Sequence, residues 1–199
     1  MSPCLEGIIL TQANVTWYGH SCFLIELAGS TVVLDPYGVG SVPGLRLPDL
    51  SADAVRVSHS HTDHGAVERV LTSGKPLNFR VREVMGDHDH HNGAHRGKNR
   101  ILVIEYEGLR LVHLGDQGCV LTQKQIDEIG HPDLLMLPVG GYFTIDAAEA
   151  RQIMDQLQPS VTVPIHYRDA AIGFDVLSTL DEFLALVDIP VVRSEERQF

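Results

Sequence analysis

The chain has 199 residues, of which 44% are hydrophobic and 21% charged, proportions typical of a globular protein rather than a disordered one. Its 15 basic and 26 acidic residues give a net charge of −11, which argues against nucleic acid or an anionic membrane as a general partner. The length fits one domain over residues 1–199.

Targeting signals are not apparent in the sequence. No apolar stretch approaches the roughly 18 residues that a membrane-spanning helix needs. Residues 1–7 lack the basic and apolar regions of a signal peptide, so we expect none. Cys4, Cys22 and Cys119 form no disulfide framework, and this odd count favours reduced thiols in a cytoplasmic protein.

The first part of the chain has the pattern of short strands separated by turns. We predict these strands over residues 15–17, 22–27, 31–34, 54–58, 79–84, 101–105 and 109–114. One helix is predicted over residues 65–71, because Val67, Val70 and Leu71 repeat at helical spacing.

The last third alternates between strands and helices. Thr122 and Asp146 each begin a capping box, which predicts helices over residues 122–129 and 146–156. A last helix is predicted over 175–187, and strands over 134–137, 161–165 and 190–192, of which 161–165 should be buried. Strands first, followed by alternation, indicate sheets covered by helices.

Histidine is concentrated in the segment Ser-His-Ser-His-Thr-Asp-His-Gly, residues 58–65. His59 and His61 leave a strand two residues apart, so their side chains can point to one side and hold one ion. Asp63 and His64 lie beyond a turn and can face the same cavity. Imidazole and carboxylate suit zinc, iron or manganese, and four such groups within six residues favour a metal site over a solvated loop.

The His-x-His-x-Asp-His motif after a short strand resembles the signature of the metallo-β-lactamase superfamily. Further motifs follow in the order of that family: Gly19-His20-Ser21, Asp35-Pro36, His88-Asp89, Arg96-Gly97-Lys98-Asn99, His113-Leu114-Gly115-Asp116, Pro138-Val139-Gly140-Gly141 and Pro164-Ile165-His166-Tyr167. Their order is similar to that of a compact branch of metal-dependent hydrolases related to ascorbate-6-phosphate lactonase. The resemblance implies an α/β fold built as a four-layer αββα sandwich.

The resemblance also implies two divalent metal ions, which we expect to be Zn²⁺, with Mn²⁺ or Fe²⁺ compatible with the same ligands. It assigns to the first ion His59, His61 and His88. It assigns to the second ion Asp63, His64 and His166. Asp116 is expected to bridge the two ions, together with a water or hydroxide.

Several neighbouring residues have more than one interpretation. His90 could compete with His88 for metal. Asp35 is expected to orient a ligand histidine or to fix the loop, rather than to form a simple strand-end turn before Pro36, and His113 to pack or hydrogen-bond rather than ligate. Arg96 and Lys98 could form an anion site or lie on the solvated surface, which we favour slightly.

The predicted activity is hydrolysis, in which a metal-bridging hydroxide attacks a small ester, lactone, amide or phosphoester. Asp63 is the candidate proton shuttle. His20 and Tyr167 could contact the substrate or stabilise an oxyanion, although His20 could equally be structural, and Tyr142 is a further possibility. We expect a small-molecule substrate and neither nucleic acid nor membrane as partner.

An iron-dependent redox enzyme that handles oxygen or a persulfide on the same fold is the alternative function. The di-iron branch usually replaces the second histidine of the motif with Glu, whereas His61 is intact. The sequence therefore favours the hydrolase, and it leaves the oligomeric state open.

Overall fold

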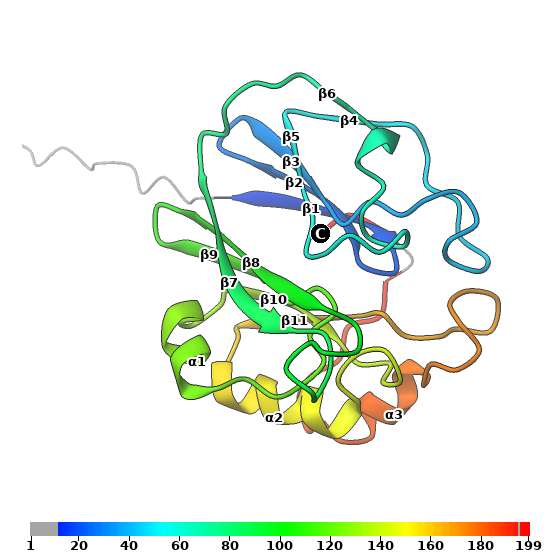
Figure 1. Cartoon of the computed structure of the whole chain (residues 1–199). Coiled ribbons are helices and arrows are strands. Elements are labelled where there is room, and N and C mark those ends of the chain that lie inside the picture. Colours follow the sequence, from blue (N-terminus) through cyan, green and yellow to red (C-terminus); the bar gives the residue numbers. More distant parts are fainter. Residues whose placement is uncertain (1–11, 195) are drawn as a thin grey trace, which may run out of the picture.

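The computed structural model describes residues 12–194 and 196–199. Two main sheets lie face to face, and the α-helices lie on one side of the pair (Figure 1). Residues 1–7, for which we expect no signal peptide, and Cys4 lie outside the described residues, whereas Cys22 and Cys119 are free thiols. None of the described helices is long and apolar enough to cross a bilayer.

The four-stranded sheet has the order β1-β2-β3-β5. Its strands are β1 (Ala13–Gly19), β2 (Cys22–Leu27), β3 (Ser30–Leu34) and β5 (Ala54–Arg56). β2 is antiparallel to both β1 and β3, and β5 is parallel to β3. Strands β1, β3 and β5 therefore run in one direction and end at the same edge of the sheet.

The five-stranded sheet has the order β11-β10-β9-β8-β7. Its strands are β7 (Arg80–Asp87), β8 (Lys98–Tyr106), β9 (Leu109–His113), β10 (Leu134–Pro138) and β11 (Val161–Ile165). β8 is antiparallel to β7 and β9, while β9, β10 and β11 are parallel. All strands except β8 therefore end at one edge.

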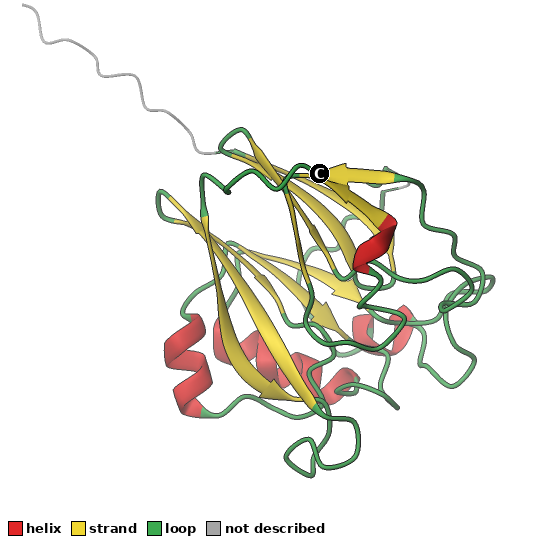
Figure 2. Ribbon diagram, turned by 45° about the horizontal axis from the view of Figure 1, so that its top comes forward, coloured by secondary structure: helices red, strands yellow, loops and turns green. Residues whose placement is uncertain are grey.

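Alternation along the strands divides the apolar side chains between two cores. In β8, Leu102 and Ile104 pack between the sheets, whereas Ile101 and Val103 face the helices. These helices are α1 (Gln123–Ile129), α2 (Ala147–Leu157) and α3 (Leu180–Leu184) (Figure 2). Both predicted capping boxes are confirmed.

The layer outside the four-stranded sheet contains little helix. The prediction of a helix over 65–71 is wrong: the segment forms only the 3₁₀ turn η1 (Val67–Arg69) and enters β6 (Val70–Thr72). β6 pairs in parallel with β4 (Leu50–Ala52), a strand that the sequence did not reveal. Val70 is buried in a third apolar cluster with Leu50, and this tertiary contact overrides the local helical spacing.

The C-terminal predictions also need correction. The helix predicted over 175–187 is confined to α3, and 190–192 form no strand and are exposed. Instead, the main chain of Phe199 exchanges two hydrogen bonds with Val15, 2.9 and 3.0 Å long, along the free edge of β1. β11 exists as predicted but lies at a sheet edge, and Val161 is 52% exposed rather than buried.

Packing between α2 and the five-stranded sheet should respond strongly to the loss of Ile153, whose side chain is fully buried there. Ile153→Ala should lower the free energy of unfolding by about 2–5 kcal/mol, because it removes apolar contact and leaves a cavity. The exposed neighbour provides the control, and Gln152→Ala should change this free energy by less than about 0.5 kcal/mol. Urea unfolding measures both variants, and equal effects would contradict the described packing.

Candidate metal centre

Strand direction brings the candidate site residues together. His20 follows β1, Asp35 follows β3, and the histidine motif begins two residues after β5. In the other sheet, His88 follows β7 and His166 follows β11, and Asp116 lies three residues beyond β9. Because these strands run in one direction within each sheet, their ends form a single edge where side chains from both sheets meet.

Asp116 lies at the centre of the histidines and is almost fully buried. Its Oδ1 atom is 3.1 Å from Nε2 of His64, and its Oδ2 atom is 3.3 Å from Nε2 of His88 and 3.3 Å from Nε2 of His166. Nε2 of His59 is 3.8 Å from the same Oδ2 atom. A carboxylate with histidines around both oxygens has the position that a bridging ligand requires.

Two groups of side chains extend to either side of Asp116. In each group the potential ligand atoms lie within 4.8 Å of one another. The first group is His59, His61 and His88, and the second is His20, Asp63, His64 and His166. A third group, His59, His64 and Asp116, overlaps both, so the structure brings all seven predicted ligands together at one site, with His20 beside them.

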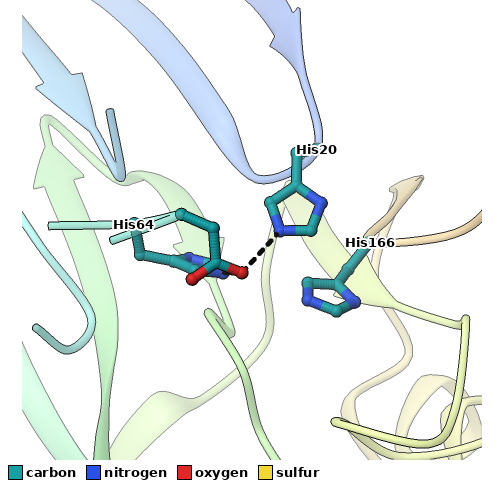
Figure 3. Close-up of side chains that lie close together, drawn as sticks. His20, His64 and His166 are labelled. Carbon is teal, nitrogen blue, oxygen red and sulfur yellow. Dashed lines mark hydrogen bonds and ion pairs between the residues drawn. The ribbon is translucent and has the colours of Figure 1, made fainter. Parts of the chain in front are cut away.

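His20 belongs to the site geometrically. Its ring centroid is 4.2 Å from that of His166 and 5.1 Å from that of His64 (Figure 3). Its Nε2 atom is 3.4 Å from Oδ2 of Asp63. His20 and His166 both have a φ of +53°, an unusual backbone conformation that clusters at functional sites.

The unpartnered polar atoms of the site fit a metal. Buried polar atoms nearly always have a hydrogen-bond partner. Within the described part of the chain, Oδ1 of Asp116 and Nε2 of His59, His64, His88 and His166 make no hydrogen bond, although Nε2 of His64 lies 3.1 Å from that oxygen. These five atoms converge on a small volume, and each carries a lone pair when the imidazole is neutral, which is the donor set of a transition-metal site.

Asp35 fixes the orientation of two proposed ligands, His64 directly and His59 through Ser58. This fully buried carboxylate accepts hydrogen bonds from Nδ1 of His64 at 2.9 Å and from Nε2 of His113 at 3.0 Å. It also accepts from the Ser58 hydroxyl at 2.6 Å, and that hydroxyl lies 2.9 Å from Nδ1 of His59. With Nδ1 as the donor in both ligand rings, Nε2 is left free for metal.

Burial lowers the pKa of two site histidines, although a carboxylate lies near each of them. Burial, followed by the charge of His64, lowers the pKa of His59 to about 3. Burial and the charge of His166 lower the pKa of His20 to about 4. Both rings are therefore neutral at pH 7, the form that coordinates metal.

The two site carboxylates remain ionised, although Asp116 is buried and Asp63 partly so. Burial raises the pKa of Asp63, but the hydrogen bond from His20 and the charge of His64 outweigh it and bring the pKa to about 2. Burial also raises the pKa of Asp116. The charges of His166 and His64 outweigh this effect, so the pKa of Asp116 lies well below the usual range. Both groups can therefore donate an anionic oxygen to a metal.

Close backbone contacts fix the positions of two proposed ligands, His166 and Asp116. A Cβ atom at Gly140 would lie 2.1 Å from the carbonyl oxygen of His166, so only glycine allows this approach. Asn99, which is fully buried, accepts from the Asp116 N–H at 3.1 Å and donates to the Leu114 carbonyl at 2.8 Å. Sequence reasoning did not assign roles to Ser58 or Asn99, although both lie within the motifs that carry the family resemblance.

Two of the sequence interpretations are not supported by the geometry. His90 is exposed and pairs with Glu149 of α2, so it does not compete with the buried His88. The prediction that Tyr167 contacts the site finds no support either. Its ring packs on Trp17, with 6.1 Å between centroids, and lines a separate cavity of about 710 Å³. The side chain of His166 faces Asp116, whereas that of Tyr167, the next residue, packs on Trp17.

Comparison with known proteins identifies the family of the chain. A family model described as "Beta-lactamase superfamily domain" matches residues 14–166. A solved structure from Thermotoga maritima, described as a candidate Zn-dependent hydrolase of the metallo-β-lactamase superfamily, is 36% identical over 89% of this chain and 87% of its own, with a TM-score of 0.69. A "UPF0173 metal-dependent hydrolase" from Carboxydothermus hydrogenoformans is 29% identical over 77% of this chain and 84% of its own.

The fold alone is shared with a more distant structure, the diiron β-hydroxylase CmlA from Streptomyces venezuelae. That protein is 15% identical over 78% of this chain and 45% of its own, with a TM-score of 0.55. The family match covers more than half of the chain, and the relatives named above it match most of their own lengths. The chain therefore belongs to the metallo-β-lactamase superfamily.

Proposed function

We propose that this protein is a metal-dependent hydrolase that holds two divalent ions, Zn²⁺ in the first instance, and acts on a small ester, lactone, amide or phosphoester. The observation that carries the proposal is the set of unpartnered Nε2 atoms around Asp116. The names of the relatives, which are metal-dependent hydrolases, support the same class of reaction.

Each proposed ion has its own ligands. His59, His61 and His88 would hold one ion, Asp63, His64 and His166 would hold the other, and Asp116 would contribute to both. When bound, two divalent ions lower the pKa of a water towards neutrality and polarise the oxygen of the group under attack. The remaining residues bind the substrate and move protons.

Asp63 is the proposed proton acceptor. Its side chain is 18% exposed, against 3% for Asp116, so of the two it has the better access to solvent. Its Oδ2 atom faces Nε2 of His20, which can hold the carboxylate in place or receive a proton from it. His20 is therefore proposed as a catalytic residue with Asp63, whereas Tyr167 is left out because its ring contacts Trp17.

His61 defines the open side of the site. It is exposed, whereas its partners His59 and His88 are buried. Solvent and substrate therefore have access from the His61 side, and the buried residues form the floor.

Hydrolysis should depend on metal and not on oxygen. The protein reconstituted with zinc or manganese should hydrolyse bis-p-nitrophenyl phosphate or a simple lactone at the same rate in air and under argon, and a chelator should abolish turnover. His59→Ala should lower kcat/KM by about 100-fold or more, because it removes a ligand. The exposed His131→Ala provides the control and should retain the activity. Consumption of a persulfide that requires oxygen, with no hydrolysis, would support the iron-dependent alternative instead.

Removing the Asp35 charge should weaken metal binding without removing any ligand. Asp35→Asn should raise the dissociation constant for zinc by about 10–100-fold, because the amide no longer accepts from both His64 and Ser58. Competition with a chromophoric chelator measures this constant. Asp49→Asn alters a fully exposed carboxylate and should leave the constant unchanged. Equal constants for all three proteins would show that Asp35 does not orient the ligands.

A further inference from the structure

Arg96 lies in a loop whose backbone is firmly held. The loop 88–97 joins β7 to β8 and begins at the proposed ligand His88. The buried carboxylate of Asp89 accepts four backbone N–H groups of the loop, those of His91, Gly93, His95 and Arg96. At the tip of the loop, His90 pairs with Glu149 of α2. The hydrogen bonds to Asp89 therefore fix the backbone of Arg96.

The guanidinium of Arg96 rests on two aromatic rings. Its Cζ atom is 5.5 Å from the centroid of Phe143 and 5.9 Å from that of Tyr142. Cation–π contacts at these distances hold the planar group in a defined orientation. The side chain is half-buried.

The same guanidinium lacks an anionic partner. Among residues 12–194 and 196–199, no carboxylate lies within 4.0 Å of it and no acceptor takes a hydrogen bond from it. Several other arginines of this chain form ion pairs, as Arg82 does with Glu105 and Arg151 with Asp155. Five N–H donors in a fixed plane are thus available to a ligand.

The aromatic rings connect Arg96 to the proposed metal centre. The centroid of Phe143 is 6.4 Å from that of His166 and 5.5 Å from that of Phe174. The centroid of Phe174 is in turn 5.9 Å from that of His20. Phe143 and Phe174 therefore form an aromatic path that links two site histidines to the guanidinium of Arg96.

Lys98 behaves differently, although it lies only two residues away. Its side chain is exposed and its ammonium pairs with Asp87. The sequence slightly favoured the solvated surface for both cations, and the exposed side chain of Lys98 lies there. Arg96 is set apart by its burial, its aromatic support and its unused donors.

We propose that Arg96 binds a carboxylate or phosphate group of the substrate while the hydrolysable group of the same molecule lies at the metal centre. This inference rests on the proposed function and narrows its substrate class to small anionic esters, lactones or amides. A planar guanidinium can make two parallel hydrogen bonds to such an anion. In a chain of net charge −11, a local cation of this kind is what would attract an anionic substrate to the site.

Binding of α,ω-dicarboxylates to the zinc-loaded protein tests the proposal without turnover. Dicarboxylates of four to eight carbons are compared by calorimetry with the monocarboxylates of the same length. One carboxylate can reach the metals and the other Arg96, so the wild-type protein should prefer the dicarboxylate of best length by about 10-fold. This exceeds the twofold advantage that two identical ends give by statistics alone.

Three variants locate the effect. Arg96→Gln should abolish the preference, Arg96→Lys should retain part of it, and Lys98→Gln should keep it in full although it removes the same charge. All three should retain the zinc content and melting temperature of the wild type, and the Arg96→Lys result identifies Arg96 even where Arg96→Gln fails to fold. No preference in the wild type, or an equal preference after either Arg96 substitution, overturns the proposal. An Arg96-dependent preference in a protein that hydrolyses no ester, lactone or phosphoester would contradict the hydrolase function and leave the anion site standing.

Discussion

The rest of the site depends on the hydrogen bonds that the buried carboxylate of Asp35 accepts. Asp35 follows β3 in one sheet and accepts a hydrogen bond from His113, the last residue of β9 in the other. It also accepts from the backbone and side chain of Ser58 and from His64, so it fixes the histidine motif at both ends. A buried charge is tolerated only with such partners, and Asp35 therefore ties the joining of the sheets to the orientation of the ligands.

The same network explains how short strands produce a defined cluster. The strand predicted over 54–58 ends at Arg56, because the Ser58 N–H donates to Asp35 at 2.6 Å instead of joining the sheet. The chain is thereby free to turn, and His59, His61 and His64 reach the edge from different directions. On the opposite side Asn99 holds the backbone before Asp116. Ligands supported in this way keep their geometry before any metal binds.

Much of this arrangement could be predicted from the sequence, because it depends on local patterns. The histidine motif, the capping boxes at Thr122 and Asp146, and the ligands at strand ends are all recognisable within a few residues. Partnerships between distant residues were recognisable only where the family resemblance supplied them, as for the ligand sets. The β4–β6 pair, which replaced the predicted helix at 65–71, depends on the burial of Val70 against Leu50. The position of Arg96 over Phe143 likewise follows from the loop that Asp89 holds and not from spacing.

The central claim, that Asp116 joins two metal ions, is tested most directly by anomalous X-ray diffraction at the zinc edge from crystals of the zinc-reconstituted protein. Two anomalous peaks are predicted for each chain, one beside His59, His61 and His88 and the other beside Asp63, His64 and His166. Each should lie about 2.0–2.2 Å from one oxygen of Asp116. A single peak, or two peaks that do not share Asp116, would contradict the account.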